Sequence, residues 1–286
     1  SFTPGPFTGK MMGADGYAGL FSRLHANELT FSTDLSLETK QMAAKRMLQY
    51  PKTLENDSVL RFAIQQLADG SPMSVALYDL AFPLGKLQTL ILEWQDHYET
   101  ITYIQSQKKL DPNIPHQPTV LDWTALQVKA EAEQIPLSNN NPFGFDNNYW
   151  KTNFPNGLKP KPVGSADQGY ITNLQNSAEW TDMEILLRIL KEQGAQPLLL
   201  GRPYNAEYYD ATGISQTARQ AFYTKMQQMA DRFGVPYVDF QEHESDILFG
   251  VDPAPHMARE GWVYVDQVLD EFFHGNLQQP LGQNHL

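Results

Sequence analysis

The sequence contains no cysteine among its 286 residues. Without thiols the chain has no disulfides, no thiolate metal ligands and no cysteine nucleophile. It is also poor in basic residues, because 21 Lys and Arg stand against 33 Asp and Glu and give a formal net charge of −12. This charge disfavours nonspecific attraction to nucleic acid or to an anionic lipid surface, so any anionic partner must be met by a local patch.

The sequence also lacks any continuous apolar run near the roughly 18 residues that a bilayer-spanning helix requires. Its richest apolar stretch, residues 87–94, is short and contains Gln88 and Glu93. Two serine-nucleophile patterns, Gly-x-Ser-x-Gly and Gly-Ser-Ser, are absent as well. From the residues alone we expect neither a membrane span nor a familiar serine nucleophile in this chain.

The remaining composition is typical of a globular protein. Hydrophobic residues make up 41% of the chain, enough for a sizeable core in one large domain or two small ones. Residues 1–33 are rich in Gly, Pro and Phe and predict loop. Residues 34–134 predict helices over about 37–48, 59–67, 84–108 and 122–135. We interpret the aromatic residues of this region as packing anchors rather than as a ligand-binding set: Trp94, Tyr98, Tyr103 and Trp123.

The final third of the chain alternates helices with short apolar runs. Helices are predicted over about 178–193, 216–233 and 259–273, and strands over 196–201 and 235–240. This order predicts a parallel sheet covered by helices. In such sheets, binding and catalytic residues gather in the loops beyond the carboxyl ends of the strands. Residues 202–213 and 242–256 occupy those positions.

The second of these loops holds the best catalytic candidate, the pair formed by Asp252 and His256. An acid a few residues before a histidine can hold the imidazole in one tautomer and direct its other nitrogen at a nucleophile. The alternative interpretation is an ordinary polar or helix-capping histidine, with Pro253 and Pro255 marking a turn. The same loop carries His243 among Glu242, Glu244 and Asp246, which we interpret as a solvated acidic loop rather than a metal site because these residues do not form an i, i+4 pair of ligands on a predicted helix.

The first loop contains candidate substrate-binding residues. Asn205 and the tyrosines, Tyr204 among them, could donate hydrogen bonds to a carbonyl or to a developing oxyanion. Arg202 could pair with a phosphate or a carboxylate. The alternative is that Asn205 is a turn residue and that the tyrosines only pack the loop against the protein.

Several motifs occur in the order found in one known family. The chain resembles the DltD family, the D-alanine transfer proteins of lipoteichoic acid D-alanylation in Gram-positive bacteria. The resemblance covers almost the whole chain and is carried by Thr3-Pro4-Gly5-Pro6-Phe7-Thr8, the 37–48 helix with Lys45-Arg46, Asn140-Asn141-Pro142-Phe143-Gly144, Glu179-Trp180-Thr181-Asp182, Pro203-Tyr204-Asn205 with Tyr209 and Gly213, and His256 with Gly261-Trp262.

The resemblance implies a single α/β domain over residues 1–286, with an SGNH-hydrolase-like or flavodoxin-like three-layer fold and a largely helical insert over about 34–134. It implies a Ser-His-Asp site that handles a D-alanyl ester or thioester without metal or cofactor. It also implies a protein at the extracellular face of the cell membrane that works with a D-alanyl carrier protein, other D-alanylation proteins and lipoteichoic acid, and not with nucleic acid. Because the chain starts at Ser1 rather than Met, we expect the first strand and a membrane anchor to lie upstream of it.

Two departures from the family pattern bear on the site. His256 matches the catalytic histidine of the family, but the acid of the pattern stands three residues earlier, where this chain has Pro253. Asp252, four residues before His256, is the nearest substitute. The nucleophile of the family lies in a Gly-Ser-Ser-Glu type motif upstream of the matched region, so we expect this chain alone to be inactive or nearly so. The alternative function is a non-catalytic module, in which the helices of residues 37–135 and the Arg202 loop dock a D-alanyl carrier protein or teichoic acid.

Overall fold

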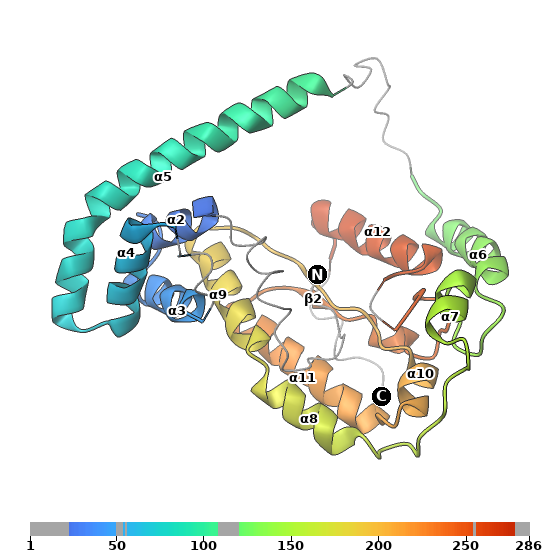
Figure 1. Cartoon of the computed structure of the whole chain (residues 1–286). Helices are drawn as coiled ribbons and strands as arrows, with labels where there is room; N and C mark the ends of the chain where they lie inside the picture. The colour runs from blue at the N-terminus through green and yellow to red at the C-terminus, as the bar shows by residue number, and fades with distance from the viewer. Residues whose placement is uncertain (1–22, 50–53, 55, 108–119, 254–255, 278–286) are drawn as a thin grey trace. The chain divides into compact units, whose positions relative to one another are not determined.

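The structure is a computed structural model that describes residues 23–49, 54, 56–107, 120–253 and 256–277. The described chain is mainly helical, with two short strands (Figure 1). Its elements, in chain order, are α2 (Arg23–Phe31), α3 (Leu37–Met47), α4 (Ser58–Asp69), α5 (Pro72–Ser106), α6 (Trp123–Gln134), η2 (Ile135–Leu137), α7 (Asn147–Asn153), α8 (Asp167–Asn176), α9 (Glu179–Glu192), β1 (Leu199–Leu200), α10 (Ala206–Ala211), α11 (Gln216–Phe233), β2 (Tyr237–Val238), η3 (Gln241–His243) and α12 (Arg259–Phe273).

The chain divides into two compact units. The helical unit comprises Lys10–Pro118 and Glu179–Ala195, and therefore contains α2 to α5 together with α9. The sheet unit comprises Ser1–Gly9, Thr119–Ala178 and Gln196–Leu286, and contains the remaining elements. The helical unit thus includes one helix, α9, that follows the region expected as an insert.

Polar contacts at both ends of α3 attach α9 to the helical unit. At one end, Ser36 caps α3 and donates from its hydroxyl to Glu192, with an O···O distance of 2.8 Å. At the other end, the guanidinium of Arg46 donates to both carboxylate oxygens of Asp182, and the Nη2–Oδ2 distance is 2.7 Å. Arg46 is buried, so this bidentate pair fixes the direction of α9 against α3.

The contact between α2 and α5 depends on a glycine. Gly85 lies in α5 against the fully buried Phe31 of α2, and a Cβ added at Gly85 would stand 2.1 Å from the phenyl ring. Nearby, Asp57 caps α4 by accepting from the amide of Leu60 and pairs with Arg23 at 2.7 Å. The helices of this unit therefore meet through a close backbone approach and a buried carboxylate.

The second half of α5 projects beyond the other helices of its own unit (Figure 1). All four of its buried residues, Ser74, Tyr78, Gly85 and Thr89, lie in the first half. The packing role expected for Trp94, Tyr98 and Tyr103 is wrong, because these side chains are 73%, 65% and 65% exposed. Among the described residues α5 is one helix long and apolar enough to cross a membrane, by length and composition alone. Charged residues interrupt the apolar ones of α5, so the sequence of this helix contains no long continuous apolar run.

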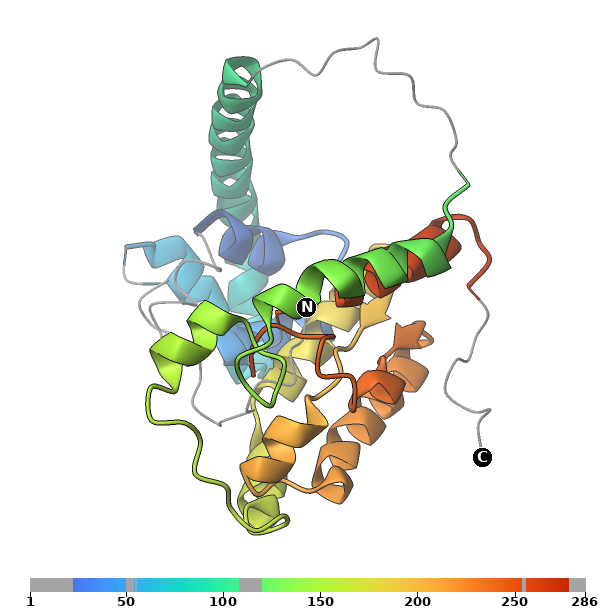
Figure 2. The same ribbon diagram turned by 90° about the vertical axis from the view of Figure 1, so that its right-hand side faces the viewer.

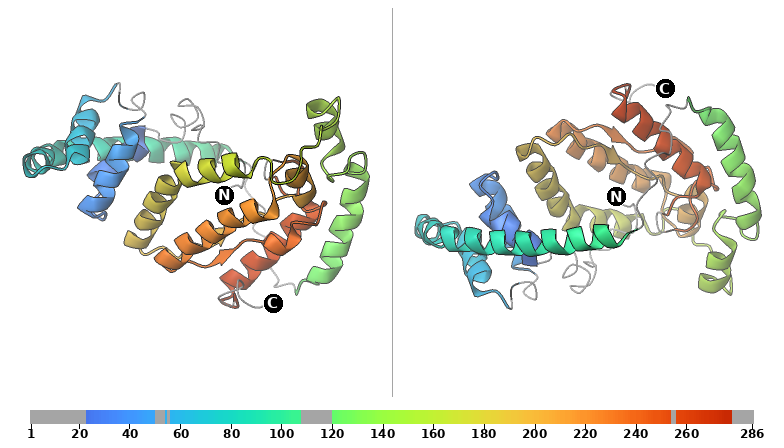
Figure 3. Two further views of the ribbon diagram at one scale, coloured as in Figure 1. Left: turned by 90° about the horizontal axis from the view of Figure 1, so that it is seen from below. Right: turned by 90° about the horizontal axis from the view of Figure 1, so that it is seen from above.

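The sheet unit contains two parallel strands, with α10 and α11 between them in the chain. Leu199 of β1 lies opposite Tyr237 of β2, and Leu200 lies opposite Val238. Helix α12 and the segment after β2 pack on this sheet through a buried cluster of Val238, Phe240, Phe249, Val265 and Val268. Helices α6 and α12 lie side by side, as do α8 and α11 (Figures 2 and 3).

The parallel pairing predicted from the two apolar runs is confirmed, and both strands and the helices that flank them lie where expected. The expected extent of the sheet is not seen, because the described residues form only two strands of two residues each and do not show a three-layer fold. Leu199 and Leu200 are accordingly only half-buried. The loop predicted over residues 1–33 is wrong for α2, and the loop predicted over residues 202–213 contains the short helix α10. Residues 1–22 lie outside the described residues.

Two glycine-to-alanine substitutions test the packing of α5. Gly85→Ala should destabilise the protein by about 1–3 kcal/mol, because the new methyl group overlaps the buried ring of Phe31 and outweighs the better helix propensity of alanine. Gly169→Ala is the matched control, since Gly169 lies inside α8 with open space around it and should gain about 0.5–1 kcal/mol. Urea denaturation followed by circular dichroism measures both. A stable Gly85→Ala variant would contradict the close approach of α2 and α5.

Candidate active site

A pocket in the sheet unit lies beyond the carboxyl ends of both strands, where the sequence predicted a site. The segment after β1 supplies five of its lining residues, and the segment after β2 supplies the others. The lining residues are Arg202, Pro203, Tyr204, Asn205, Tyr209, His243, Asp246, Phe249, Gly250, Asp252, Pro253, His256 and Met257.

The second segment forms a hairpin-like turn that displays Asp252 and His256. Gly250 and Met257 form an isolated antiparallel bridge. The amide of Val251 donates to the carbonyl of His256 at 2.9 Å, and the amide of Ala258 donates to the carbonyl of Phe249 at 2.9 Å. These bonds bring residues 252 and 256 opposite one another, although Ala254 and Pro255 at the tip lie outside the described residues.

The predicted contact between Asp252 and His256 is present. The imidazole Nδ1 lies 2.6 Å from Asp252 Oδ2, and the backbone amide of His256 donates to Asp252 Oδ1 at 3.4 Å. The carboxylate is 9% exposed and the imidazole 73%. With Nδ1–H donating to the carboxylate, Nε2 carries the free lone pair and is available to accept a proton from a nucleophile.

Residues 141–146 support this hairpin from one side. Asn141 accepts hydrogen bonds from the amides of Phe143 and Phe145, and the amide of Asp146 donates to the carbonyl of Val251 at 2.8 Å. Gly144 has φ +66°, and a Cβ there would lie 2.0 Å from the carbonyl oxygen of Ile247. The Asn-Pro-Phe-Gly motif thus has a structural role: it allows two backbone segments to approach closely.

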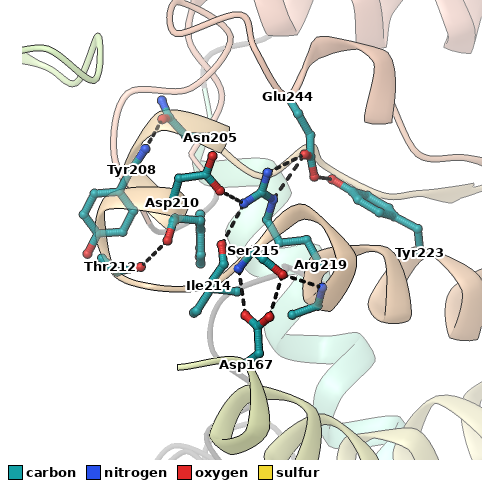
Figure 4. Close-up of polar contacts among 12 residues, drawn as sticks. Asp167, Asn205, Tyr208, Asp210, Thr212, Ile214, Ser215, Arg219, Tyr223 and Glu244 are labelled. Atoms are coloured by element: carbon teal, nitrogen blue, oxygen red, sulfur yellow. Dashed lines mark hydrogen bonds and ion pairs between the residues drawn. The ribbon is translucent and has the colours of Figure 1, made fainter. Parts of the chain in front are cut away.

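A buried ion-pair network connects the two segments that line the pocket. Arg219, in α11, donates from Nη1 to Asp210 at 2.6 Å and to the carbonyl of Ile214 at 2.8 Å. Its Nε and Nη2 face Glu244, each 3.1 Å from Oε2, and the hydroxyl of Tyr223 donates to the other oxygen of Glu244 (Figure 4). Burial alone would lower the pKa of Arg219, but the hydrogen bonds to Asp210 and Glu244 raise it.

Tyr204 and Asn205 line the pocket but are held by other contacts. The hydroxyl of Tyr204 is hydrogen-bonded to that of Tyr170, and Tyr204 is buried. Asn205 caps α10 by accepting from the amide of Tyr208 and donates from Nδ2 to the carbonyl of Phe143 at 2.8 Å. Tyr204 therefore belongs to a packed tyrosine cluster, and Asn205 has one remaining amide hydrogen to offer.

Tyr209, which the sequence names only as a motif residue of the first loop, also lines the pocket. Its buried hydroxyl faces the carbonyl of Pro253 at 3.4 Å, so it contacts the hairpin from the other loop. The other predicted binding residue of this loop, Arg202, is half-buried in the pocket, and burial lowers its pKa to about 10 while Asp252 and Tyr209 act in the opposite direction.

His243 is not a solvated side chain. Its ring lies 4.7 Å from that of Phe249 and 4.3 Å from that of Tyr264, measured between centroids, and is 17% exposed. Beside it, Glu260 in the first turn of α12 is buried. Burial, together with the charges of Asp246 and Glu131, raises the pKa of Glu260 to about 7. The described residues contain no group of three or more His, Asp or Glu side chains arranged to hold a metal ion.

Two parallel strands flanked by helices define a protein of the α/β class, and the pocket with the Asp252–His256 contact lies beyond the carboxyl ends of the strands, the usual position of a site in that class. The chain belongs to the DltD family, whose sequence pattern, described as DltD protein, matches residues 2–274. It is 30% identical over 257 residues to Protein DltD of Bacillus subtilis (strain 168), which covers 90% of this chain and 62% of that protein. It is 22% identical over 276 residues to Protein DltD of Staphylococcus aureus (strain NCTC 8325 / PS 47), which covers 96% of this chain and 66% of that protein. The chain therefore spans less than two thirds of the length of either relative.

The raised pKa of Glu260 predicts a pH-dependent stability. A carboxyl whose pKa rises on folding, here from 4.5 to about 7, stabilises the fold below the unfolded value, and this contribution is lost as the pH rises through about 7. Glu260→Gln should therefore be more stable than the native protein at pH 8, by about 1–3 kcal/mol, and equally stable at pH 4. Thermal unfolding across this pH range measures the difference. A constant difference at all pH values would show that Glu260 is not the titrating group.

Proposed function

We propose that the protein takes part in acyl transfer, handling a D-alanyl ester or thioester in the D-alanylation of lipoteichoic acid. The observation that carries this proposal is the 2.6 Å contact between Asp252 and His256 in a pocket at the carboxyl ends of parallel strands. Membership of the DltD family supports the choice of D-alanine as the acyl group.

In this proposal His256 is the general base and acid. Asp252 holds Nδ1–H, and Nε2 removes the proton of a hydroxyl as its oxygen attacks the acyl carbonyl carbon. When the tetrahedral intermediate collapses, the bond from the carbonyl carbon to the leaving oxygen or sulfur breaks, and the imidazolium returns the proton to that atom. The large exposed surface of His256 leaves the imidazole accessible to a substrate.

The nucleophilic hydroxyl is the part that the described pocket does not supply, because none of its lining residues is serine or threonine. We propose that a serine outside the matched region provides it, as in the family pattern. The remaining amide hydrogen of Asn205 is the best donor to the developing oxyanion among the predicted residues. Tyr204 is less suited to that role, because its hydroxyl is already paired with Tyr170.

The cellular context is part of the proposal. We place the protein at the extracellular face of the cell membrane, with a D-alanyl carrier protein or another D-alanylation protein as donor and teichoic acid as acceptor. The alternative function predicted from the sequence, a non-catalytic docking module, does not need an imidazole paired with a shielded carboxylate. The geometry of Asp252 and His256 therefore favours the enzyme.

Substitution of His256 tests the catalytic role. His256→Ala should lower kcat for a D-alanyl ester by about 10²–10⁴, because the general base is lost while folding is unaffected. The matched control is His274→Ala, since His274 also faces an acid four residues earlier, Asp270 at 3.2 Å, but lies at the end of α12 outside the pocket. Hydrolysis of the D-alanyl ester is measured with the full natural protein. Equal rates for the two variants would refute the proposal.

Substitution of Asp252 tests the positioning of the imidazole. Asp252→Asn should lower kcat by up to about 10⁴ with little change in KM, since the amide no longer fixes the required tautomer. Asp252→Glu should recover part of the rate. If kcat of Asp252→Asn stays at the native value, another group holds His256.

A further inference from the structure

Arg202 occupies an unusual position in the pocket. It follows β1 by two residues and lines the pocket together with Asp252 and His256. Its Nε is shielded from solvent and has no hydrogen-bond partner. No ion pair joins its guanidinium to any residue that the structure describes.

The carboxylates that line the same pocket are engaged elsewhere. Both oxygens of Asp252 face His256, one toward the imidazole and one toward the backbone amide. One oxygen of Asp246 accepts from the amide of Leu248 at 3.0 Å. The guanidinium of Arg202 therefore shares the pocket with two carboxylates, Asp252 and Asp246, that already have other hydrogen-bond partners.

The contrast with Arg219 shows that this fold can satisfy a buried guanidinium fully. Arg219 has two carboxylates and a carbonyl as acceptors, whereas the described residues supply none to Arg202. A half-buried charge such as Arg202 without protein acceptors costs free energy, because the part of its hydration that is lost is not replaced. Such a group gains most from a ligand that brings the missing acceptor, and a planar guanidinium fits the two oxygens of an oxyanion.

We propose that Arg202 is the anion-binding residue of this pocket and holds a singly charged oxyanion of the substrate, a phosphodiester or a carboxylate, beside the Asp252–His256 pair. The assignment of that oxyanion to the substrate rests on the proposed function. The anion site itself depends only on the position of Arg202. It makes the pocket selective for substrates whose anionic group lies close to the acyl carbonyl.

Thermal stability in the presence of small anions tests the site. Dimethyl phosphate and acetate represent the two oxyanions and are compared with chloride at equal ionic strength and pH. At ten times its Kd, a bound anion should raise the Tm of the native protein by about 2–6 °C. A rise with dimethyl phosphate alone assigns a phosphodiester, and a rise with acetate alone assigns a carboxylate. No rise with either anion overturns the proposal.

Variants of Arg202 test whether the anion that raises the Tm binds at this residue. Arg202→Met should have a Tm equal to or above that of the native protein without anion, because an apolar chain replaces an unpaired buried charge, and it should not respond to either anion. Arg202→Lys keeps the charge but loses the planar fork, so its Kd for the anion should rise several-fold. The control is Arg232→Met, which removes an exposed guanidinium from the last turn of α11 and should leave the anion response unchanged. An anion response that survives in Arg202→Met overturns the proposal.

A spectroscopic readout on the native protein covers the case in which Arg202→Met fails to fold. The imidazole signals of His256, identified by their loss in His256→Ala, should shift as dimethyl phosphate or acetate is added, and those of His274 should not. Unshifted His256 signals at saturating anion would place binding elsewhere and overturn the inference. Retained ester hydrolysis in His256→Ala would instead overturn the proposed function and leave the anion site standing.

Discussion

The site depends on the buried charge of Arg219. Its guanidinium projects from α11, the helix that leads into β2, and its acceptors come from both segments that follow the strands: Asp210 in α10 and Glu244 after η3. The carbonyl of Glu244 also accepts from the amide of Ala206 at 2.8 Å, so the loops are joined through backbone as well. Breaking a buried pair of this kind costs about 3–5 kcal/mol, because the remaining charge stays uncompensated. The distance between the Arg202 side and the His256 side of the pocket is therefore set by three charged side chains, those of Arg219, Asp210 and Glu244, which do not themselves line it.

Local periodicity predicted the elements that are long or strongly apolar, and tertiary contacts formed the others. Helices α4 and α11 end where expected, at glycines with φ of 69° and 66°. Helices α7 and α10 have seven and six residues, too short to be stable alone, and each begins at an Asp or Asn cap within a segment that is otherwise typical of a turn. The exposed aromatic residues of α5 show that apolar residues at helical spacing predict a helix but do not predict which part of the protein packs against it.

The contact between Asp252 and His256 was predictable because the two residues are close in sequence, but the backbone geometry that forms it was not. The shift of the acid from three to four residues before His256 suggested a lost contact. The bridge between Gly250 and Met257 removes the difficulty, because two hairpin arms bring residues 252 and 256 opposite each other. By contrast, the partners of Arg219 and Tyr223 in Glu244 lie 25 and 21 residues away, and no spacing rule identifies them. A buried network of this kind can be identified only from the folded structure, in which α11 packs against the strands.

Two arginines of the sheet unit, Arg219 and Arg202, differ in how the protein compensates their charge. Arg219 is neutralised by the protein and its pKa is raised, whereas burial lowers the pKa of Arg202 to about 10, so this group stays protonated at neutral pH with its charge poorly compensated. A fold tolerates such a cost where the group meets a ligand, since the ligand then returns the interaction that solvent has lost.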